Sequence, residues 1–270
     1  MVTPADIAQV EASLVSVRFL GCSCRVAPRL AAKLAKVEAS LHAEWQRTMV
    51  ALPGGAHAPT FAEWHGIRGV GGYRARAGWH GKALAVDLNV STNGYAITRT
   101  VVGGRAILGG ERAGAKLPRV RARFYEACER ACAAAGVPCD LSARYKGEST
   151  GAMWDRWHAV SEAVRAYVGP YYETHDALDN GAADVRPGVV VPAQVADDYE
   201  ALRVPLVVGG PSLHPSSMRN PARCVMDIPR AVAVALCDVG GMRWGAGDFG
   251  PSESGDLMHF DTASRIPSGA

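Results

Sequence analysis

The sequence lacks any run of about 18 apolar residues, the length that a membrane-spanning helix requires. Its first residues also lack the basic segment and the apolar stretch of a secretory signal peptide. We therefore expect a chain that is synthesised in the cytoplasm without a signal peptide and has no membrane span. A large excess of basic residues is missing too: 29 lysines and arginines face 26 acids, for a net charge of +3. This small excess argues against nucleic acid as a partner.

The seven cysteines are odd in number and follow no regular spacing, so reduced thiols are expected rather than a disulfide framework. Cys128 and Cys132 lie four residues apart, with Cys139 after them. They could belong to a metal cluster, but burial as small apolar side chains is the more frequent role. The remaining composition, 48% hydrophobic and 20% charged over 270 residues, is that of a globular protein with one large domain or two small ones.

Two short segments far apart in the chain carry residues that could bind a metal ion. In the first, His80 precedes Asp87 by seven positions (87 − 80), with the small residues Ala83 and Ala85 between them. In the second, the candidate is His259. Two imidazoles and one carboxylate are a ligand set that catalytic zinc sites favour, because a fourth position stays open for water. The sequence therefore predicts a zinc site formed by His80, Asp87 and His259.

Asp256 stands three positions before His259 and would be the acid–base residue of this site. A carboxylate beside the metal can accept a proton from water whose pKa the metal has lowered. On a regular strand, residues three apart face opposite ways, so the two side chains converge only if a turn at Gly255 leads into a strand. The sequence thus predicts a turn followed by a strand at this point.

At these residues the chain resembles the peptidase M15 family, which includes the zinc D,D-peptidases and the L-alanyl-D-glutamate peptidases of peptidoglycan. That family carries the motif S-x-H-x-x-G-x-A-x-D and, later in the chain, E/D-x-x-H. The first motif is matched by His80, Ala85 and Asp87. The second is matched by Asp256 and His259.

The resemblance covers residues 20–95 and 225–262, with two departures. Gly78 stands where the family usually has Ser, which removes a hydroxyl near the metal, and Ala83 stands where it usually has Gly. The second departure exchanges one small residue for another. Residues 240–249, which read GGMRWGAGDF, are similar to the W-G-G-D-W segment of the L-alanyl-D-glutamate peptidases.

The resemblance implies an α+β fold of the hedgehog/DD-peptidase type, a small antiparallel sheet with flanking helices that binds a zinc ion (Zn²⁺). It also implies an upstream arginine that stabilises the oxyanion, as a fixed positive charge can. Arg68 is the favoured candidate by its distance from His80 and Arg74 is the rival, while a solvated surface role stays open for each. Trp244 and Asp248 are expected to bind substrate, although Asp248 could equally be a turn residue.

We expect a discontinuous peptidase core at residues 1–92 and 222–270, with a mainly helical insertion at residues 93–221. Compact members of the family join their two motifs by a much shorter segment. Proline and glycine signals mark helix ends, and Gly169-Pro170 is expected to stop one of them. With apolar periodicity, these signals predict helices at 3–15, from 28 onward, at 118–135, 151–168, from about 192 and at 227–237, and a strand at 83–90.

The favoured activity is zinc-dependent hydrolysis of an amide bond in peptidoglycan stem peptides, of the L-alanyl-D-glutamate type. A D-alanyl-D-alanine carboxypeptidase or dipeptidase is the alternative, and a zinc-stabilised binding module without turnover is a third hypothesis. Because no export signal is visible, such an enzyme would act on the cell wall after release or delivery. It would be a lysin that passes through a holin, or a toxin carried by a secretion or injection apparatus. A cytoplasmic enzyme of wall recycling is the remaining setting.

Overall fold

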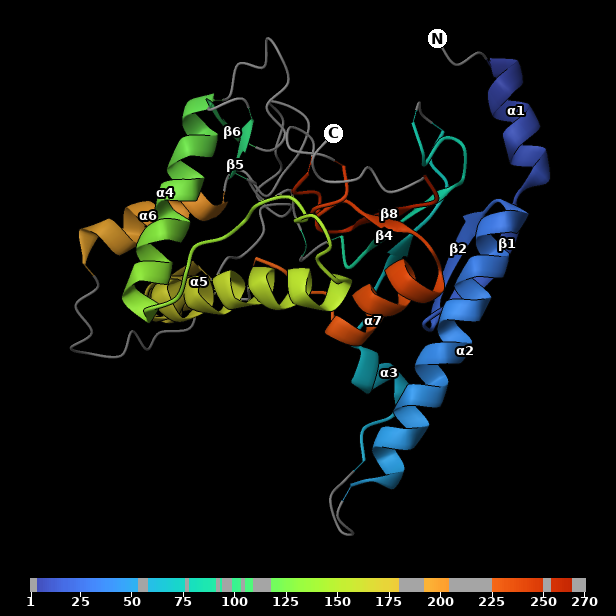
Figure 1. Ribbon diagram of the computed structural model, residues 1–270, viewed down its shortest axis with the longest axis horizontal. Coiled ribbons are helices and arrows are strands. Elements are labelled where there is room, and N and C mark those ends of the chain that lie inside the picture. Colours follow the sequence, from blue (N-terminus) through green and yellow to red (C-terminus); the bar gives the residue numbers. More distant parts are fainter. Residues whose placement is uncertain are drawn as a thin grey trace.

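The computed structural model describes residues 4–52, 58–75, 78–90, 93, 99–102, 105–108, 118–179, 192–203, 225–249 and 254–263. Helices combine with short antiparallel strands in an α+β fold (Figure 1), which confirms the predicted fold class at this coarse level. In chain order the elements are α1 (Pro4–Ser13), β1 (Val15–Phe19), β2 (Cys22–Val26), α2 (Pro28–Val50), α3 (Phe61–His65), β3 (Val70–Gly71), β4 (Ala85–Leu88), β5 (Arg99–Val102), β6 (Arg105–Leu108), α4 (Pro118–Ala135), α5 (Thr150–Asp179), α6 (Ala193–Arg203), α7 (Arg230–Val234), the π-helical turn η4 (Ala235–Val239), β7 (Arg243–Trp244) and β8 (His259–Asp261).

A four-stranded antiparallel sheet with the strand order β3-β4-β8-β7 joins the two motif segments. Strand β4 pairs with β8 so that Asp87 lies opposite His259 and Val86 lies opposite Phe260. Because side chains alternate between the faces of a strand, the first pair lies on one face and the second pair on the other. Phe260 and Trp244, its partner on β7, are fully buried and stack with their rings nearly parallel. The sheet thus has an apolar face in the core and a polar face that carries the motif residues.

Helix α2 begins at Pro28, as predicted, and extends along one side of the molecule (Figure 1). Its apolar stripe, from Leu30 to Leu41, is buried at helical spacing. This stripe packs on strand β1 and on η4, which follows α7. The helix therefore supports the segment that leads directly into β7.

The hairpin β1–β2 replaces the end of the first predicted helix. That helix was expected to reach residue 15, but it ends at Ser13, and Val15 begins β1. Leu20 and Gly21 join the two strands with φ values of 49° and 80°. Two successive residues with positive φ are the requirement of a tight two-residue hairpin turn.

Helices α4, α5 and α6 pack against one another and are called here the helical segment, residues 118–179 and 192–203. Helix α4 has the predicted bounds and is followed by Gly136, whose φ of 68° is the left-handed conformation common after helices. Helix α6 begins at Ala193, next to its predicted start. Within the described residues, the chain between the two motif segments also contains the short hairpin β5–β6.

The predicted end of α5 is wrong. The helix does not stop at Gly169-Pro170 but continues to Asp179. A proline inside a helix removes one backbone hydrogen bond. Tyr171, which follows it, packs on Tyr199 of α6 with ring centroids 5.0 Å apart. Tertiary packing beyond the proline thus outweighs the local signal.

A buried ion pair joins the three helices of the helical segment. Asp198 of α6 is 1% exposed and accepts hydrogen bonds from Arg130 Nε (2.9 Å) and Nη2 (2.6 Å). It also accepts from the hydroxyl of Tyr167 (2.9 Å) and from the amide of Gln194 (3.0 Å). Among the described residues, the hydrogen bonds to this carboxylate therefore come from α4, α5 and α6 itself.

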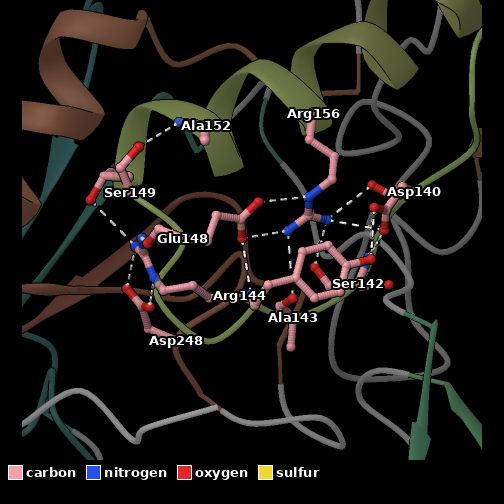
Figure 2. A network of polar contacts seen from close by, with 11 residues as sticks. Asp140, Ser142, Ala143, Arg144, Glu148, Ser149, Ala152, Arg156 and Asp248 are labelled. Atoms are coloured by element: carbon pink, nitrogen blue, oxygen red, sulfur yellow. Dashed lines mark hydrogen bonds and ion pairs between the residues drawn. The ribbon is translucent and has the colours of Figure 1, made fainter.

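A second polar network connects the helical segment to the turn after β7 (Figure 2). Arg156 binds the carboxylate of Glu148 through Nε (3.0 Å) and Nη2 (2.9 Å) and the carbonyl oxygen of Ser142 through Nη1 (3.0 Å). Arg144, from the same loop, extends toward Asp248, with Nη2 3.2 Å from Oδ2. Because Asp248 follows β7, this contact fixes the loop against the sheet.

The helical segment and the remainder of the described chain share one buried apolar cluster. Trp154 of α5 donates its indole N–H to the carbonyl of Ile228 (2.7 Å), and α7 lies between α5 and α2 (Figure 1). The predicted domain boundaries, at residues 92–93 and 221–222, involve residues outside the described ranges. The division into a core and an insertion therefore stays a prediction.

Two further sequence expectations concern cysteines and membrane spans. The described cysteines are free thiols: Cys22, Cys24, Cys128, Cys132, Cys139 and Cys237. Cys128 and Cys132 are buried between helices, and burial raises the pKa of the Cys128 thiol, as expected of packing residues. Among the described residues, no helix has the length and apolar character needed to cross a membrane.

Candidate metal site

The three predicted ligands lie together at the polar face of the sheet, although they come from distant parts of the chain. His80 precedes β4, Asp87 lies in β4 and His259 begins β8. His80 Nε2 is 2.9 Å from Asp87 Oδ1 and 3.1 Å from His259 Nδ1, and the latter two atoms are 3.0 Å apart. The ligand atoms of a tetrahedral zinc ion with bonds of about 2.0–2.1 Å lie about 3.3 Å from one another. The three atoms thus form a triangle of about the size that one metal ion requires.

Burial and outer hydrogen bonds orient these groups. The exposed fractions of His80, Asp87 and His259 are 2%, 3% and 8%. His80 Nδ1 lies 2.7 Å from the carbonyl oxygen of Gly72. Because a carbonyl only accepts, Nδ1 carries the proton and Nε2 faces the centre as an acceptor, the usual arrangement of a metal-binding histidine. The residues present therefore fit a metal ion.

The charges at the centre are strongly coupled. Burial lowers the pKa of His259, but the carboxylates of Asp261, Asp87 and Asp256 outweigh this effect and raise the pKa to about 9. Burial likewise acts to raise the pKa of Asp87, yet its contacts with the imidazoles of His259 and His80 hold it well below its usual range. The centre thus stabilises an anionic carboxylate together with positive charge, the balance that a bound cation would supply.

The two candidate arginines occupy different places. Arg74 Nη2 lies 2.6 Å from Asp87 Oδ2, the oxygen on the other side of the carboxylate from the triangle atom. Gly71, opposite Asp87 in the sheet, makes room for this contact, since a Cβ there would lie 3.0 Å from Arg74 Nη2. Arg68 instead pairs with Asp227, and its side chain is 61% exposed. The geometry therefore favours the rival candidate, Arg74, over Arg68.

Asp256 lies just before a turn that separates it from the strand at His259. Gly255 has a φ of 115°, a turn spans the next residues, and the strand begins at His259. The amide of His259 lies 3.3 Å from the carbonyl oxygen of Asp256. The half-buried Asp256 carboxylate is close enough for its charge to raise the pKa of His259. Asp256 is thus an acidic residue whose charge acts on the candidate ligand His259.

The expected substrate-binding residues Trp244 and Asp248 are both buried. Trp244 is fully buried, and its indole N–H donates to the carbonyl of Leu257 (2.8 Å). Asp248 is 2% exposed and accepts from the Trp244 amide (2.9 Å) as well as from Arg144. Both side chains therefore stabilise the turn after β7, and their role in substrate binding stays a prediction. For Asp248 this matches the other reading of the sequence, a turn aspartate.

The two departures from the family motif differ in consequence. Ala83 has a φ of 55°, in the left-handed region that glycine adopts without steric cost. The Gly of the motif at this position would therefore fit the backbone better than Ala. Gly78 has a φ of 94°, and a Cβ added there would meet no atom within 4 Å. Ala83 therefore stores strain next to the site, whereas Gly78 has no close packing partner among the described residues.

Sequence reasoning missed three groups that orient the ligands: the carbonyl of Gly72 and the side chains of Asp261 and Arg243. A backbone carbonyl leaves no trace in the residue types. Asp261 could have been found from the sequence, because the order His-Phe-Asp on a strand puts the two polar side chains on the same face.

The comparisons found no family model that matches the chain, no similar curated protein and no similar solved structure. The account of the site therefore depends on the contacts described above.

Proposed function

We propose that the protein is a zinc-dependent peptidase that hydrolyses an amide bond in peptidoglycan stem peptides, with the L-alanyl-D-glutamate bond favoured. The observation that carries the proposal is the buried triangle of His80 Nε2, Asp87 Oδ1 and His259 Nδ1, with sides of 2.9–3.1 Å. Two imidazoles and one carboxylate leave a coordination position open, which distinguishes catalytic zinc sites from structural ones. The order β3-β4-β8-β7, with both motifs on adjacent central strands, supports a hedgehog/DD-peptidase type of fold.

Each residue near the triangle has a role in this proposal. Bound zinc supplies Lewis acidity that polarises a carbonyl and lowers the pKa of water. Asp256 accepts the proton of the attacking water and passes it to the leaving amine, as a general acid–base residue does. Its position beside His259 supports this role. Asp256 is therefore the acid–base residue that we assign.

Arg74 is the cation that we assign to the oxyanion. Its side chain is 37% exposed, while its Nη2 contacts Asp87 at 2.6 Å, so it lies both at the site and within reach of solvent. A fixed positive charge at this place stabilises negative charge that develops on the substrate oxygen. Arg68, in its pair with Asp227, has no such position.

The cellular setting follows from the substrate. Peptidoglycan lies outside the cytoplasmic membrane, so we propose that the enzyme acts on the wall after release or delivery. A holin or a secretion or injection apparatus would be its partner. Both a lysin and a delivered toxin fit this description.

The test combines metal content with cleavage of purified muropeptides. The wild type is expected to contain about one zinc ion per chain and to release fragments cut after L-alanine. Asp256→Ala should keep the zinc and lose cleavage by about 100-fold or more. Asp155→Ala, which removes an exposed acid paired with Arg230, is the matched control and should cleave normally.

Two results would overturn the proposal: a wild type without bound metal, or equal cleavage by wild type and Asp256→Ala. Release of free D-alanine would replace the favoured bond by the D-alanyl-D-alanine bond. Chromatography of the fragments separates the two products.

A further inference from the structure

The polar face of the sheet continues beyond the three ligands. Asp261 lies two residues after His259 on β8, so both side chains stand on the same face. Arg243 of β7 is the direct cross-strand partner of Asp261, and Ala85 of β4 is its partner on the other side. The small side chain of Ala85 leaves space on this face. The strand register therefore brings an acid and a guanidinium next to a metal-ligand candidate.

Asp261 is fully buried and has four close contacts. Its Oδ1 accepts from Arg243 Nε (2.9 Å) and from the amide of Ala263 (2.9 Å). Its Oδ2 accepts from Arg243 Nη2 (2.7 Å) and lies 3.4 Å from Nε2 of His259. Arg243 thus binds the carboxylate through two parallel contacts and directs Oδ2 at the outer nitrogen of the imidazole.

The same guanidinium also packs on a ring that contacts His259. Arg243 Cζ lies 4.6 Å from the ring centroid of Phe249. Phe249 meets the imidazole of His259 edge to face, with centroids 5.4 Å apart. The imidazole is therefore restrained on one side by a carboxylate and on another by an aromatic ring, and Arg243 contacts both restraints.

We propose that Asp261 and Arg243 are positioning residues for His259. The Asp261 carboxylate, 3.4 Å from His259 Nε2, holds the imidazole in the orientation in which Nδ1 faces His80 and Asp87. Arg243 fixes the carboxylate in the required direction. Outer partners of this kind orient metal-binding histidines and change metal affinity by about 10–100-fold when they are lost. The inference rests on the proposed zinc site and adds the residues that set its affinity.

The molecule contains a control for this proposal. Arg130 and Asp198 form a pair of the same chemistry, with two parallel contacts and a buried carboxylate, but in the helical segment. Asp198 completes its contacts with Tyr167 and Gln194 and not with an imidazole. Loss of either pair removes an ion pair with a buried carboxylate, but only the pair of the sheet adjoins the triangle of ligand atoms.

The experiment measures Zn²⁺ affinity of the full chain by competition with a chromophoric chelator. Thermal unfolding of the metal-free chain checks the fold. Asp261→Asn keeps the shape of the side chain and should weaken affinity about 10–100-fold, and Arg243→Met should weaken it about tenfold. The ligand-field absorption of the Co²⁺ form should shift in both variants. Asp198→Asn and Arg130→Met should lower the unfolding temperature and change affinity by less than about twofold.

The proposal is overturned if Asp261→Asn and Arg243→Met bind Zn²⁺ like the wild type, or if the Asp198 and Arg130 variants lose affinity equally. If a single variant fails to fold, the double variant Arg243→Met with Asp261→Asn leaves no unpaired buried charge and should fold with weakened affinity. Wild-type affinity in the double variant would also refute the proposal. A wild type that binds no Zn²⁺ would instead contradict the proposed function, so the two failures are distinguishable.

Discussion

The sheet that carries the candidate metal site and the helical segment each contain a buried aspartate bound by one arginine through two parallel contacts. In the helical segment, Asp198 binds Arg130 and neutral donors, and its contacts join three helices. In the sheet, Asp261 binds Arg243 and also faces His259. The same ion pair can therefore serve stability in one place and orientation in another. What differs is the further group that the carboxylate contacts besides its arginine: an imidazole for Asp261, a hydroxyl and an amide for Asp198.

The largest difference between the two regions is expected in zinc binding, when one histidine of each region is replaced by alanine. His80→Ala deletes one corner of the triangle and should abolish zinc binding, since two ligands do not hold the ion. His158→Ala deletes a ring in α5 that stacks on Trp154 with centroids 4.3 Å apart. The second variant should retain about one zinc ion per chain. Metal analysis after dialysis checks both, and equal zinc in the two variants would refute the difference between the regions.

A second effect should appear in the helical segment as a pH dependence of stability. Burial acts to raise the pKa of Asp198, but hydrogen bonds from Arg130, Tyr167 and Gln194 lower it below its usual value. A lowered folded-state pKa means that the stabilisation is present above the unfolded-state pKa of about 3.9 and is lost as pH falls through the folded-state value.

Asp198→Asn should therefore reduce the free energy of unfolding by about 1–3 kcal/mol at pH 7. The side chain of Arg130 is 40% exposed, so its guanidinium can reach water once the carboxylate is lost, which limits the cost. The difference from wild type should shrink as the pH falls below about 4. Urea unfolding at several pH values measures it. A difference that stays constant with pH would show that the carboxylate charge contributes nothing.

Replacing one glycine of each region by alanine should affect stability and cleavage differently in the two regions. A Cβ at Gly245 would lie 2.4 Å from the carbonyl oxygen of Asp256 and 3.0 Å from its Cβ. Gly245→Ala should therefore displace Asp256, cost about 1–3 kcal/mol and lower cleavage. A Cβ at Gly169 in α5 would meet nothing within 4 Å, so Gly169→Ala should leave cleavage unchanged and raise the free energy of unfolding by about 0.5–1 kcal/mol, the helix preference of Ala over Gly. Unfolding and muropeptide assays on both variants test this, and normal cleavage by Gly245→Ala would contradict it.

The smallest expected effect is on the free energy of unfolding when one alanine of each region is replaced by glycine. The sign of this effect should differ between the two regions. Ala83→Gly relieves a φ of 55° and should raise the free energy of unfolding by about 0.5–1 kcal/mol. Ala133→Gly, at an exposed position in α4, should lower it by about 1 kcal/mol. Chemical denaturation of both variants measures the signs. A loss of stability in Ala83→Gly would show that the left-handed conformation is not strained.

Local patterns in the sequence predicted a substantial part of this structure. The bounds of α4 and the start of α2 follow from proline, glycine and apolar spacing. The two motifs identified His80, Asp87 and His259, which the structure brings together. Their convergence depends on the antiparallel pairing of β4 with β8, which places Asp87 opposite His259.

Features that depend on distant contacts could not be predicted in the same way. Distance along the chain favoured Arg68, but the direction of each side chain, and not its distance in sequence, brings Arg74 to Asp87. Helix α5 passes Pro170 because packing against α6 outweighs a local stop signal. Trp244 resembled a substrate-binding residue by its neighbours in sequence, yet the register of β7 turns it into the core.

The most direct test of the central claim is a zinc-soaked crystal measured at the zinc absorption edge. The account predicts an anomalous peak within about 2.0–2.2 Å of His80 Nε2, Asp87 Oδ1 and His259 Nδ1. A peak elsewhere, or none at this triangle in crystals that contain zinc, would contradict it.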